Sequence, residues 1–292
     1  MFQLLDGKAT AIEIKNRIAN EVRQYTQQGL RAPHLAAILV GDDGASQTYV
    51  ANKEKSSHEV GFTSSVYRYA EGTSERQLLE TIDFLNHDEE VDGFIVQLPL
   101  PGHIDEQHII NAINPKKDVD GFTPVNLGNM MLGEDCFVPA TPKGICTLLR
   151  HYEIETEGRH CVVIGRSNIV GTPVANLLSR KGFDCTVTLC HSRTQHLSAL
   201  TRQADILVVA MGKPEFVTAD MVKEGAVVVD VGIHRVADAS RKSGFRLLGD
   251  VKHDEVDERC SWVTPVPGGV GPLTIVSLLE NTLQAYKRTM AL

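Results

Sequence analysis

Short apolar runs of strand length alternate with amphipathic stretches of helix length along the first half of the chain. The stretch that follows Ser74 repeats apolar residues at the spacing of one helix face, and Ser74 stands three residues before Gln77, as in a helix capping box. The predicted strands of this half are 34–41, 64–70 and 92–101, and the predicted helices are 44–60, 74–85 and 105–113.

The alternation restarts after two prolines in the segment CFVPATPKG, which marks a seam in the chain. Crossover helices between buried strands are typical of parallel sheets, so we predict an α/β protein of two domains. The expected domains are 1–140 and 141–271, and a last helix within 272–292, beginning at Pro272, is expected to pack back on the first domain. The predicted strands of the second half are 160–165, 185–190, 204–210 and 225–232, and the predicted helices are 144–152, 171–181, 195–203 and 218–223.

The composition narrows the class of protein. The 292 residues carry a net charge of −8, so there is no basic footprint for nucleic acid. No apolar run approaches the roughly 20 residues of a membrane helix, and charges at Asp6 and Lys8 interrupt the region where a signal peptide has its apolar core. The six cysteines form no C-x-x-C pair and the eleven histidines show no metal-binding spacing. We therefore expect reduced thiols, a cytoplasmic protein and no metal.

The segment VVIGRSNIVGTPVANLL places a glycine-containing turn between a predicted strand and a predicted helix. The backbone amides of such a turn and the helix N-terminus bind phosphate groups. The match to the dinucleotide motif G-x-G-x-x-G is imperfect: Gly165 and Gly171 are present, but Ser167 replaces the second glycine and Val170 the third. The alternative interpretation is that the glycines serve only a steric role in the turn. Because the turn lies between two buried strands, we favour dinucleotide binding.

The end of the next predicted strand indicates which dinucleotide binds. NAD-selective sites usually carry an acidic residue there for the ribose hydroxyls, whereas this chain has His191, Ser192, Arg193 and Thr194. Arg193, Arg166 in the turn and the Ser192 hydroxyl would attract a 2′-phosphate. A solvated surface arginine is the alternative at either position, but two arginines at the two relevant positions favour NADP.

Seven motifs occur in the order YVANK, VQLPLP, KDVDGF, PATPKG, GRSNIVGTP, HSRT and PVPGGVGPLT. Together they resemble the bifunctional methylenetetrahydrofolate dehydrogenase/methenyltetrahydrofolate cyclohydrolase family, from about Leu4 to Tyr286. Two positions depart from the family pattern, Ala140 where Cys is common and Leu273 where Met is common, and both exchanges are apolar. The resemblance implies a folate-binding catalytic domain, a Rossmann-like NADP-binding domain, an active site in the cleft between them, and a homodimer acting on tetrahydrofolate derivatives.

The resemblance also implies roles for individual residues. Lys53 would be the catalytic lysine, with Tyr49 one helical turn before it over the folate; Gln97 would assist the lysine and Asp120 would hold the pterin. The implied folate-binding set is Tyr49, Lys53, Gln97, Leu98, Pro99, Asp120, Pro265, Gly268, Gly269 and Pro272. The expected NADP-binding set is Thr141, Gly165, Arg166, Ser167, Val170, Gly171, His191, Ser192, Arg193, Thr194, Ala210, Gly212, Gly232, Ile233 and Gly271.

The implied chemistry makes specific demands on these side chains. Hydride removal leaves a cation on the one-carbon bridge, and a protonated Lys53 about 4 Å away would oppose it by about 4 kcal/mol at an effective dielectric constant near 20. A neutral lysine could take a proton from the attacking water and return it to the departing nitrogen. The Gln97 amide could orient the lysine or the water, and the Asp120 carboxylate could accept two hydrogen bonds from the pterin.

Each of these residues also has a purely structural interpretation. Taken alone, Lys53 is more often a solvated helix charge, Tyr49 a packing residue and Gln97 a polar group at a strand end. Asp120 would ordinarily be a turn residue, since Asp-Gly favours turns. The family resemblance is what favours the functional interpretation.

Three rival functions are weighed against this one. The tyrosine–lysine pair of short-chain dehydrogenases is rejected, because there the glycine-rich turn precedes the pair, whereas here it follows by more than a hundred residues. A two-domain NADP-dependent reductase of a cyclic hydroxy acid, similar to shikimate dehydrogenase, would have the same order of domains. A dinucleotide sensor without catalysis would have no need of a proton carrier such as Lys53.

Overall fold

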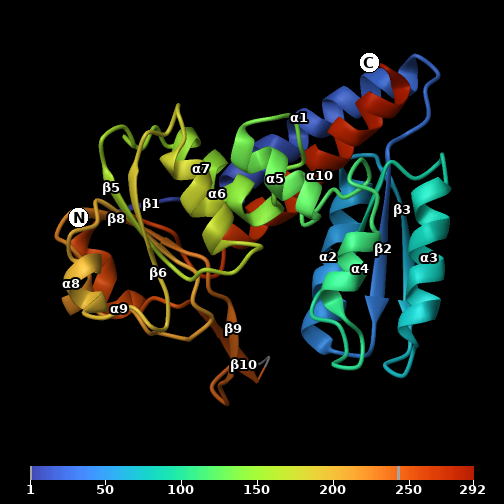
Figure 1. The fold of residues 1–292 in the computed structure, drawn as a ribbon. Coiled ribbons are helices and arrows are strands. Elements are labelled where there is room, and N and C mark those ends of the chain that lie inside the picture. Colours follow the sequence, from blue (N-terminus) through green and yellow to red (C-terminus); the bar gives the residue numbers. More distant parts are fainter. Residues whose placement is uncertain (1, 242–243) are drawn as a thin grey trace. The chain divides into compact units, whose positions relative to one another are not determined.

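The computed structural model describes residues 2–241 and 244–292, which form two compact units. One, here called the three-stranded unit, comprises Ile12–Ala140 and Ile275–Leu292. The other, the six-stranded unit, comprises the chain up to Ala11 together with Thr141–Thr274. The boundary falls inside helix α1 (Gly7–Gln27) and inside helix α10 (Val270–Met290), so both helices contribute residues to each unit (Figure 1).

A parallel sheet forms the centre of the three-stranded unit. Its order is β3 (Thr63–Tyr69), β2 (His34–Val40) and β4 (Gly93–Val96). The central strand is buried at every position after His34, as expected of a parallel strand covered on both faces. The shorter helices of this unit are α2 (Gly44–Glu59), α3 (Glu75–His87), α4 (Glu106–Ala112) and α5 (Pro124–Leu132).

The amphipathic pattern of α3 corresponds to its burial. Leu78 on its apolar face is fully buried in the same core as the strand residue Phe94. The predicted capping box is confirmed: Gln77 N donates to the Ser74 hydroxyl at 3.3 Å, and Ser74 N donates to the Gln77 side chain at 3.4 Å. The cap satisfies backbone amides that have no partner within the helix, and α3 therefore begins directly after Ser74.

The C-terminal helix is held in the three-stranded unit by buried side chains. The Tyr286 hydroxyl donates to Arg31 O at 2.9 Å, and Asn281 Nδ2 donates to Val119 O at 2.8 Å and to Val138 O at 2.9 Å. The helix begins two residues before the predicted start at Pro272, at Val270. A proline fits there because the amides of a first helical turn lack intrahelical partners.

A partly buried ion pair fixes the start of strand β2. The Arg31 guanidinium donates to both carboxylate oxygens of Asp92 at 2.7 Å, and His34 N donates to Asp92 Oδ2 at 2.8 Å. The Asp92 side chain is fully buried. One carboxylate thus joins the residues before β2 to the residues before β4.

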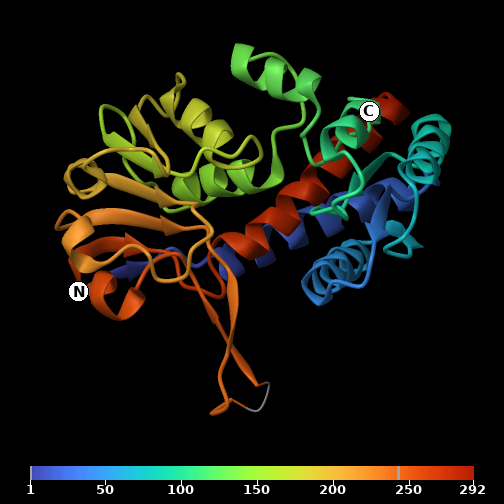
Figure 2. The same cartoon turned by 60° about the horizontal axis from the view of Figure 1, so that its bottom comes forward.

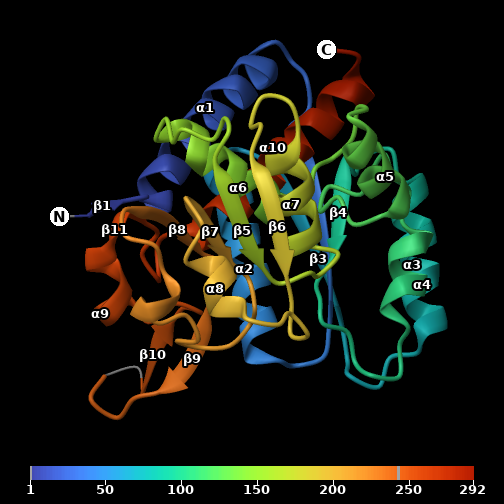
Figure 3. The same ribbon diagram turned by 60° about the vertical axis from the view of Figure 1, so that its left-hand side comes forward.

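The six-stranded unit contains a parallel sheet in the order β1-β11-β8-β7-β5-β6 (Figure 3). Its apolar core includes Val162, Leu207 and Val228 from three neighbouring strands, all fully buried. The strands are β1 (Gln3–Leu4), β5 (His160–Ile164), β6 (Thr186–Cys190), β7 (Ile206–Val209), β8 (Ala226–Asp230) and β11 (Cys260–Val263). The helices are α6 (Ala140–His151), α7 (Gly171–Ser179), α8 (Leu197–Thr201) and α9 (His253–Val256), with 3₁₀ turns at Ala219–Met221 and Asp257–Arg259. The two-domain α/β architecture predicted from the alternation is confirmed.

The first residues of the chain group with the six-stranded unit, whereas the expected first domain began at residue 1. Strand β1 pairs with β11, Leu5 N donates to Val263 O at 2.9 Å, and Lys8 N donates to Gly268 O at 2.8 Å. A two-residue strand is too short to show a period, and its partner lies near the other end of the chain. Such a pairing therefore leaves no pattern in the local sequence.

Further differences from the predicted elements lie in the six-stranded unit. Strands β9 (His234–Ala237) and β10 (Phe245–Leu248) form an antiparallel pair, and the hairpin extends away from the sheet (Figure 2). The predicted helix 218–223 is a single 3₁₀ turn. Val217 forms an isolated bridge just before it, and Gly225, at φ +77°, turns the chain into β8 just after it, so there is space for only one turn.

None of the helices in the described part of the chain combines the length and hydrophobicity that crossing a bilayer requires.

Candidate active site

Helix α2 presents Lys53 on its inner face. Ser46, Val50 and Ser57 are buried, and together with Lys53 they recur at the spacing of one helix face. Most of these inner residues are small and polar. Helix α2 therefore shows little hydrophobic periodicity, although one of its faces is buried. Ser57 Oγ donates to Lys53 O at 2.9 Å, and the lysine itself is half-buried.

The Lys53 amine reaches the end of strand β4. Its Nζ donates to Gln97 Oε1 at 3.3 Å, and Nε2 of the same amide donates to Leu98 O at 2.7 Å. Gln97 directly follows β4, and its backbone amide donates to Ile38 O at 2.9 Å, which continues the sheet ladder. Pro99 follows and is exposed. Open α/β sheets bind ligands at the carboxyl ends of their strands, and Gln97 lies at such an end.

Asp120 lies on a turn that Asp118 holds in place. Asp118 is 1% exposed, and its Oδ1 accepts from Gly121 N at 3.0 Å and from Phe122 N at 3.2 Å. Its Oδ2 accepts from Thr123 N at 2.7 Å. A buried carboxylate that accepts three backbone amides fixes the course of the turn, so Asp118 determines where the Asp120 side chain is presented.

The charges of Asp120 and Lys53 influence each other. Burial raises the pKa of the Asp120 carboxyl, and the positive charge of Lys53 acts in the opposite direction. Tyr49, one turn before Lys53 on α2, is 42% exposed, and partial burial raises the pKa of its phenol. In the three-stranded unit Gln97 and Asp120 thus lie near the Lys53 amine, and Tyr49 lies one turn before Lys53 on α2.

The glycine turn after β5 is tightly packed. Gly165 adopts φ +118°, and a Cβ there would lie 2.1 Å from Ala210 O. A Cβ on Gly171 would lie 1.8 Å from Gly165 O, so neither glycine can be replaced without moving backbone. Ser167 Oγ accepts from Val170 N at 3.2 Å and from Gly171 N at 3.4 Å, which explains how a serine serves at the position of the second motif glycine. This turn and the N-terminus of α7 fit a dinucleotide phosphate.

The residues after β6 form a second turn at the same edge of the sheet. His191 N donates to Thr194 Oγ1 at 2.8 Å, and Arg193 N donates to His191 Nδ1 at 3.1 Å. The side chains of Ser192, Arg193 and Arg166 are exposed. The side chains of both arginines are therefore solvent-exposed after the carboxyl ends of β5 and β6, where they can bind an anionic ligand.

The segment 265–272 leads into helix α10 within the six-stranded unit. Gly268 adopts φ +112°, and a Cβ on Gly269 would lie 2.7 Å from Pro265 O. Gly269 O in turn is the nearest neighbour of Gly7, where a Cβ would approach to 1.8 Å. Gly7 and Gly269 are required for close backbone packing and Gly268 for its positive φ, so their steric role is established independently of any ligand. Gly271 and Pro272 lie in the first turn of α10.

Thr141 and Leu273 belong to the same part of the six-stranded unit. The Thr141 hydroxyl is 3.0 Å from that of Thr274. Leu273, one of the two departures from the family pattern, is fully buried, and its Cβ would lie 2.9 Å from a Cβ on Gly144. Ala140, the other departure, is 2% exposed. Both departures are thus packing residues.

Buried carboxylates link the loops that follow β7 and β8. Asp230, at the end of β8, accepts from Gly232 N at 2.9 Å, and Asp250, after β10, accepts from Gly212 N at 2.9 Å. These loops contain the predicted residues Ala210, Gly212, Gly232 and Ile233. Neither aspartate was among the predicted site residues. Several of their partners come from distant segments, among them Asp250 N for Asp230 and Met211 N for Asp250. A single acidic residue near a strand end carries no local signal of such a contact.

His253 on α9 completes this buried network. Its Nδ1 lies 2.7 Å from Asp257 Oδ1 and its Nε2 lies 3.2 Å from Asp230 Oδ2. Burial opposes the charged form, but the hydrogen bonds and charges of Asp230 and Asp257 outweigh it and raise the pKa of His253 to about 9. His253 is therefore a cation at neutral pH.

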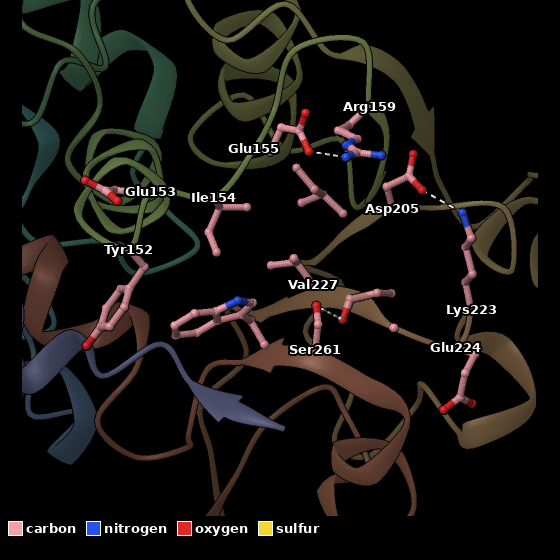
Figure 4. Close-up of a pocket in the computed structure, with 14 residues that line it drawn as sticks. Tyr152, Glu153, Ile154, Glu155, Arg159, Asp205, Lys223, Glu224, Val227 and Ser261 are labelled. Atoms are coloured by element: carbon pink, nitrogen blue, oxygen red, sulfur yellow. Dashed lines mark hydrogen bonds and ion pairs between the residues drawn. The ribbon is translucent and has the colours of Figure 1, made fainter. Parts of the chain in front are cut away.

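A cavity of about 480 Å³ lies at the opposite edge of the six-stranded sheet (Figure 4). It is lined by Asp205 before β7, Gly225 before β8 and Ser261 at the start of β11, hence at the amino ends of the strands. Lys223 Nζ is 2.6 Å from Asp205 Oδ1 across it. None of the predicted site residues lines this cavity.

Two family models match the chain. The catalytic domain of tetrahydrofolate dehydrogenase/cyclohydrolase matches residues 5–120, and the NAD(P)-binding domain of the same family matches residues 139–290. A curated relative, the "Bifunctional protein FolD" of Porphyromonas gingivalis, is 60% identical over 288 residues, which cover 98% of this chain and 97% of the relative.

Solved structures of the same kind also match. The FolD methylenetetrahydrofolate dehydrogenase/cyclohydrolase of Campylobacter jejuni has a TM-score of 0.92 and 47% identity, with 99% of both chains covered. The methylenetetrahydrofolate dehydrogenase-cyclohydrolase of Trypanosoma brucei, solved as a complex with NADP cofactor and inhibitor, has a TM-score of 0.95 and 38% identity over 100% of this chain and 99% of that chain.

The fold and the glycine turn define a two-domain α/β protein with a Rossmann-like nucleotide-binding sheet. More particularly, the chain belongs to the tetrahydrofolate dehydrogenase/cyclohydrolase family, which confirms the predicted resemblance. The shikimate dehydrogenase of Aquifex aeolicus is a weaker match, with 12% identity and a TM-score of 0.51 over 89% of this chain and 93% of that chain. A likeness at that level shows the fold alone.

The raised pKa of His253 predicts a loss of stability at alkaline pH. Protonated His253 contributes stability that is fully present below its ordinary pKa of 6.5 and is lost as pH rises through about 9. Between pH 6.5 and pH 9.5 the free energy of unfolding should fall by about 3 kcal/mol more in the wild type than in His253→Gln. Urea unfolding at the two pH values measures this. His87→Gln, at a ring that is 78% exposed, is the matched control, and equal pH dependence of wild type and His253→Gln would contradict the assignment.

Proposed function

We propose that this chain oxidises 5,10-methylenetetrahydrofolate with NADP and then hydrolyses the resulting 5,10-methenyltetrahydrofolate to 10-formyltetrahydrofolate. Membership of the tetrahydrofolate dehydrogenase/cyclohydrolase family supports both reactions. The observation that carries the proposal is the half-buried Lys53 amine, which donates to Gln97 at 3.3 Å and affects the pKa of Asp120. A solvated surface lysine would be expected to point away from a strand end instead.

In the first reaction a hydride leaves the carbon that bridges N5 and N10 of the folate, and bound NADP accepts it. The bridge becomes a cation delocalised over both nitrogens. A protonated amine about 4 Å away would oppose this cation by about 4 kcal/mol at an effective dielectric constant near 20. Lys53 therefore acts as a neutral amine, or its charge is turned towards Gln97 Oε1 and the Asp120 carboxylate during this step.

In the second reaction water attacks the cationic carbon. Neutral Lys53 accepts a proton from this water and delivers it to N5 as the bond between carbon and N5 breaks. The other proton of the water leaves the carbinol oxygen, so one proton is released overall and the formyl group stays on N10. Gln97 cannot act as an acid or base, and its amide orients the Lys53 amine instead.

Asp120 and Tyr49 bind the pterin in this proposal. The raised pKa of Asp120 reflects the cost of burying its charge, and the amino group and ring N–H of a pterin would offset that cost with two hydrogen bonds. The ring of Tyr49, 42% exposed one turn from Lys53, offers a flat apolar surface to the folate. Leu98 lines a small cavity together with Asp120.

NADP is the proposed cofactor. The turn at Gly165 and Gly171 leads directly into the N-terminus of α7, whose backbone amides would bind the pyrophosphate. The exposed guanidinium groups of Arg166 and Arg193 would bind the 2′-phosphate that distinguishes NADP from NAD. The similar structure from Trypanosoma brucei, solved with NADP, supports this choice.

We also propose that the chain forms a homodimer through strand β3. This strand is an edge of the three-stranded sheet, and a groove of about 390 Å³ beside it is lined by Tyr67, Tyr69 and Phe84, the last 56% exposed. An unpaired edge with aromatic neighbours can pair with the same edge of a second copy in a twofold arrangement.

Replacement of Lys53 by methionine should abolish hydrolysis of methenyltetrahydrofolate, because the variant keeps a flexible, unbranched side chain but lacks the amine that carries the proton. We expect a loss of at least about 100-fold in the decay of the methenyl chromophore, and a smaller loss in NADPH formation. Lys55→Met is the matched control, since Lys55 lies on the same helix with a side chain that is 75% exposed. A correctly folded Lys53→Met enzyme with near-normal ring opening would remove the lysine from the mechanism.

Replacement of Arg193 by alanine should reduce the preference for NADP over NAD. We expect the ratio of kcat/KM for the two cofactors to fall by about tenfold, because a charge-assisted hydrogen bond to the 2′-phosphate is lost. Steady-state kinetics with each cofactor measure the ratio. Arg202→Ala, an exposed arginine elsewhere on the same unit, should leave it unchanged. An unaltered ratio in Arg193→Ala would refute the assignment of this residue.

The dimer proposal predicts a mass of twice 32.0 kDa in sedimentation equilibrium at micromolar concentration. Phe84→Glu should shift the equilibrium towards monomer, because a carboxylate would be buried in the aromatic groove. Leu132→Glu, at a side chain that is 78% exposed elsewhere on the same unit, is the control. A wild-type chain that sediments as a monomer would exclude the dimer, and a dimeric Phe84→Glu variant would place the interface elsewhere.

A further inference from the structure

Two buried aspartates lie beneath the loops at the carboxyl ends of β7 and β8. Asp230 is 1% exposed and Asp250 is fully buried. Burial of a carboxylate is costly unless hydrogen-bond donors surround it, so the donors that each one accepts from identify the segments it holds.

Asp250 holds the loop after β7. Its Oδ2 accepts from Met211 N at 2.7 Å and from Gly212 N at 2.9 Å, and its Oδ1 accepts from His234 Nε2 at 2.7 Å. Three donors from two separate segments thus converge on one side chain. The loop after β7 and the start of hairpin strand β9 are joined through it.

Asp230 holds Asp250 itself. Its Oδ1 accepts from Asp250 N at 2.9 Å and from Gly232 N at 2.9 Å, and its Oδ2 accepts from Val251 N at 2.9 Å. The loop after β8 and the residues after β10 are therefore joined in the same way. The contacts are close: a Cβ on Gly232 would lie 2.5 Å from Asp250 Cγ.

The loop that Asp250 holds is in contact with the glycine turn. Ala210 directly precedes Met211, and its carbonyl oxygen would lie 2.1 Å from a Cβ on Gly165. A shift of the loop would therefore change the backbone against which the turn at Gly165 is packed. A connected series of contacts runs from the Asp250 carboxylate through the Met211 and Gly212 amides to Ala210 and Gly165.

We propose that Asp250 is a positioning residue for NADP: by binding the amides of Met211 and Gly212 it holds the loop after β7 against the glycine turn that receives the dinucleotide. The inference rests on the proposed NADP site. Asp250 does not touch the cofactor in this account and acts only through the backbone.

If electrostatic repulsion were the only influence, replacing Asp250 by a neutral residue would have the opposite effect on NADP affinity. A negative charge beneath a site for a polyanion repels the ligand, so its removal should tighten binding if repulsion were the only influence. The positioning role predicts weaker NADP binding. A neutral amide oxygen accepts hydrogen bonds from Met211 N and Gly212 N less strongly than a carboxylate oxygen does, and the NH₂ group of the amide cannot accept at all. The direction of the change in NADP affinity therefore separates the two explanations.

The test compares Asp250→Asn with Asp92→Asn in the full-length chain. Asp92 is the matched control: it is a fully buried aspartate that also accepts from a backbone amide, His34 N, but it lies in the three-stranded unit. Calorimetric titration with NADP should give a Kd about threefold weaker in Asp250→Asn and about tenfold weaker in Asp250→Ala, and an unchanged Kd in Asp92→Asn. Amide hydrogen exchange in the absence of NADP should be faster at Met211 and Gly212 in the Asp250 variants only.

The outcomes distinguish this inference from the proposed function. If the wild type does not bind NADP, the proposed function fails. If the wild type binds NADP and Asp250→Asn binds it equally or more tightly, or if Met211 and Gly212 exchange as in the wild type, the positioning role is overturned while the proposed function stands. If Asp250→Ala does not fold, Asp250→Asn decides the question alone, and a loss of affinity that Asp92→Asn shares to the same extent also counts against the role.

Discussion

A protonated amine and a carbocation cannot lie a few ångströms apart without a large electrostatic penalty, and this constraint governs the site around Lys53. The family chemistry requires a cation on the folate bridge, and the Lys53 amine is held at the end of β4 by Gln97. Burial raises the pKa of the Asp120 carboxyl and the charge of Lys53 lowers it, so the two groups interact electrostatically. The Asp120 carboxylate can therefore partly offset the charge of a protonated Lys53. The neutral Gln97 acceptor and the Asp120 anion screen the charge of the amine when it is protonated, and the neutral amine can accept a proton during hydrolysis.

The parallel sheets could be predicted from the sequence because a strand covered on both faces is a short continuous apolar run. HLAAILV in β2 and HCVVI in β5 are such runs, and the structure has strands at both. Strand β1 and the hairpin of β9 and β10 could not be predicted in this way. The first is two residues long and depends on a partner near the other end of the chain, and the second is half-exposed, so neither has a clear apolar period.

Only those residues of the candidate site that lie in sequence motifs could be predicted. Lys53 lies on a buried helix face lined by serines, which a hydrophobic pattern does not detect, and only the family motif singled it out. Asp230 and Asp250, which hold the loops after β7 and β8, escaped prediction for a related reason. Both accept mainly from backbone amides, and a backbone donor cannot be recognised from the residue type at its position. In both units, buried carboxylates bound to amides fix the loops that carry the site residues.

Chemical rescue of Lys53→Ala tests the central claim most directly, namely that the nitrogen at this helix position carries the proton. The measurement is the decay of the methenyltetrahydrofolate chromophore in the presence of small primary amines. The account predicts that hydrolysis by the variant rises with amine concentration and with amine basicity. If the amines accelerate the variant no more than they accelerate the same hydrolysis in buffer, Lys53 is not the proton carrier.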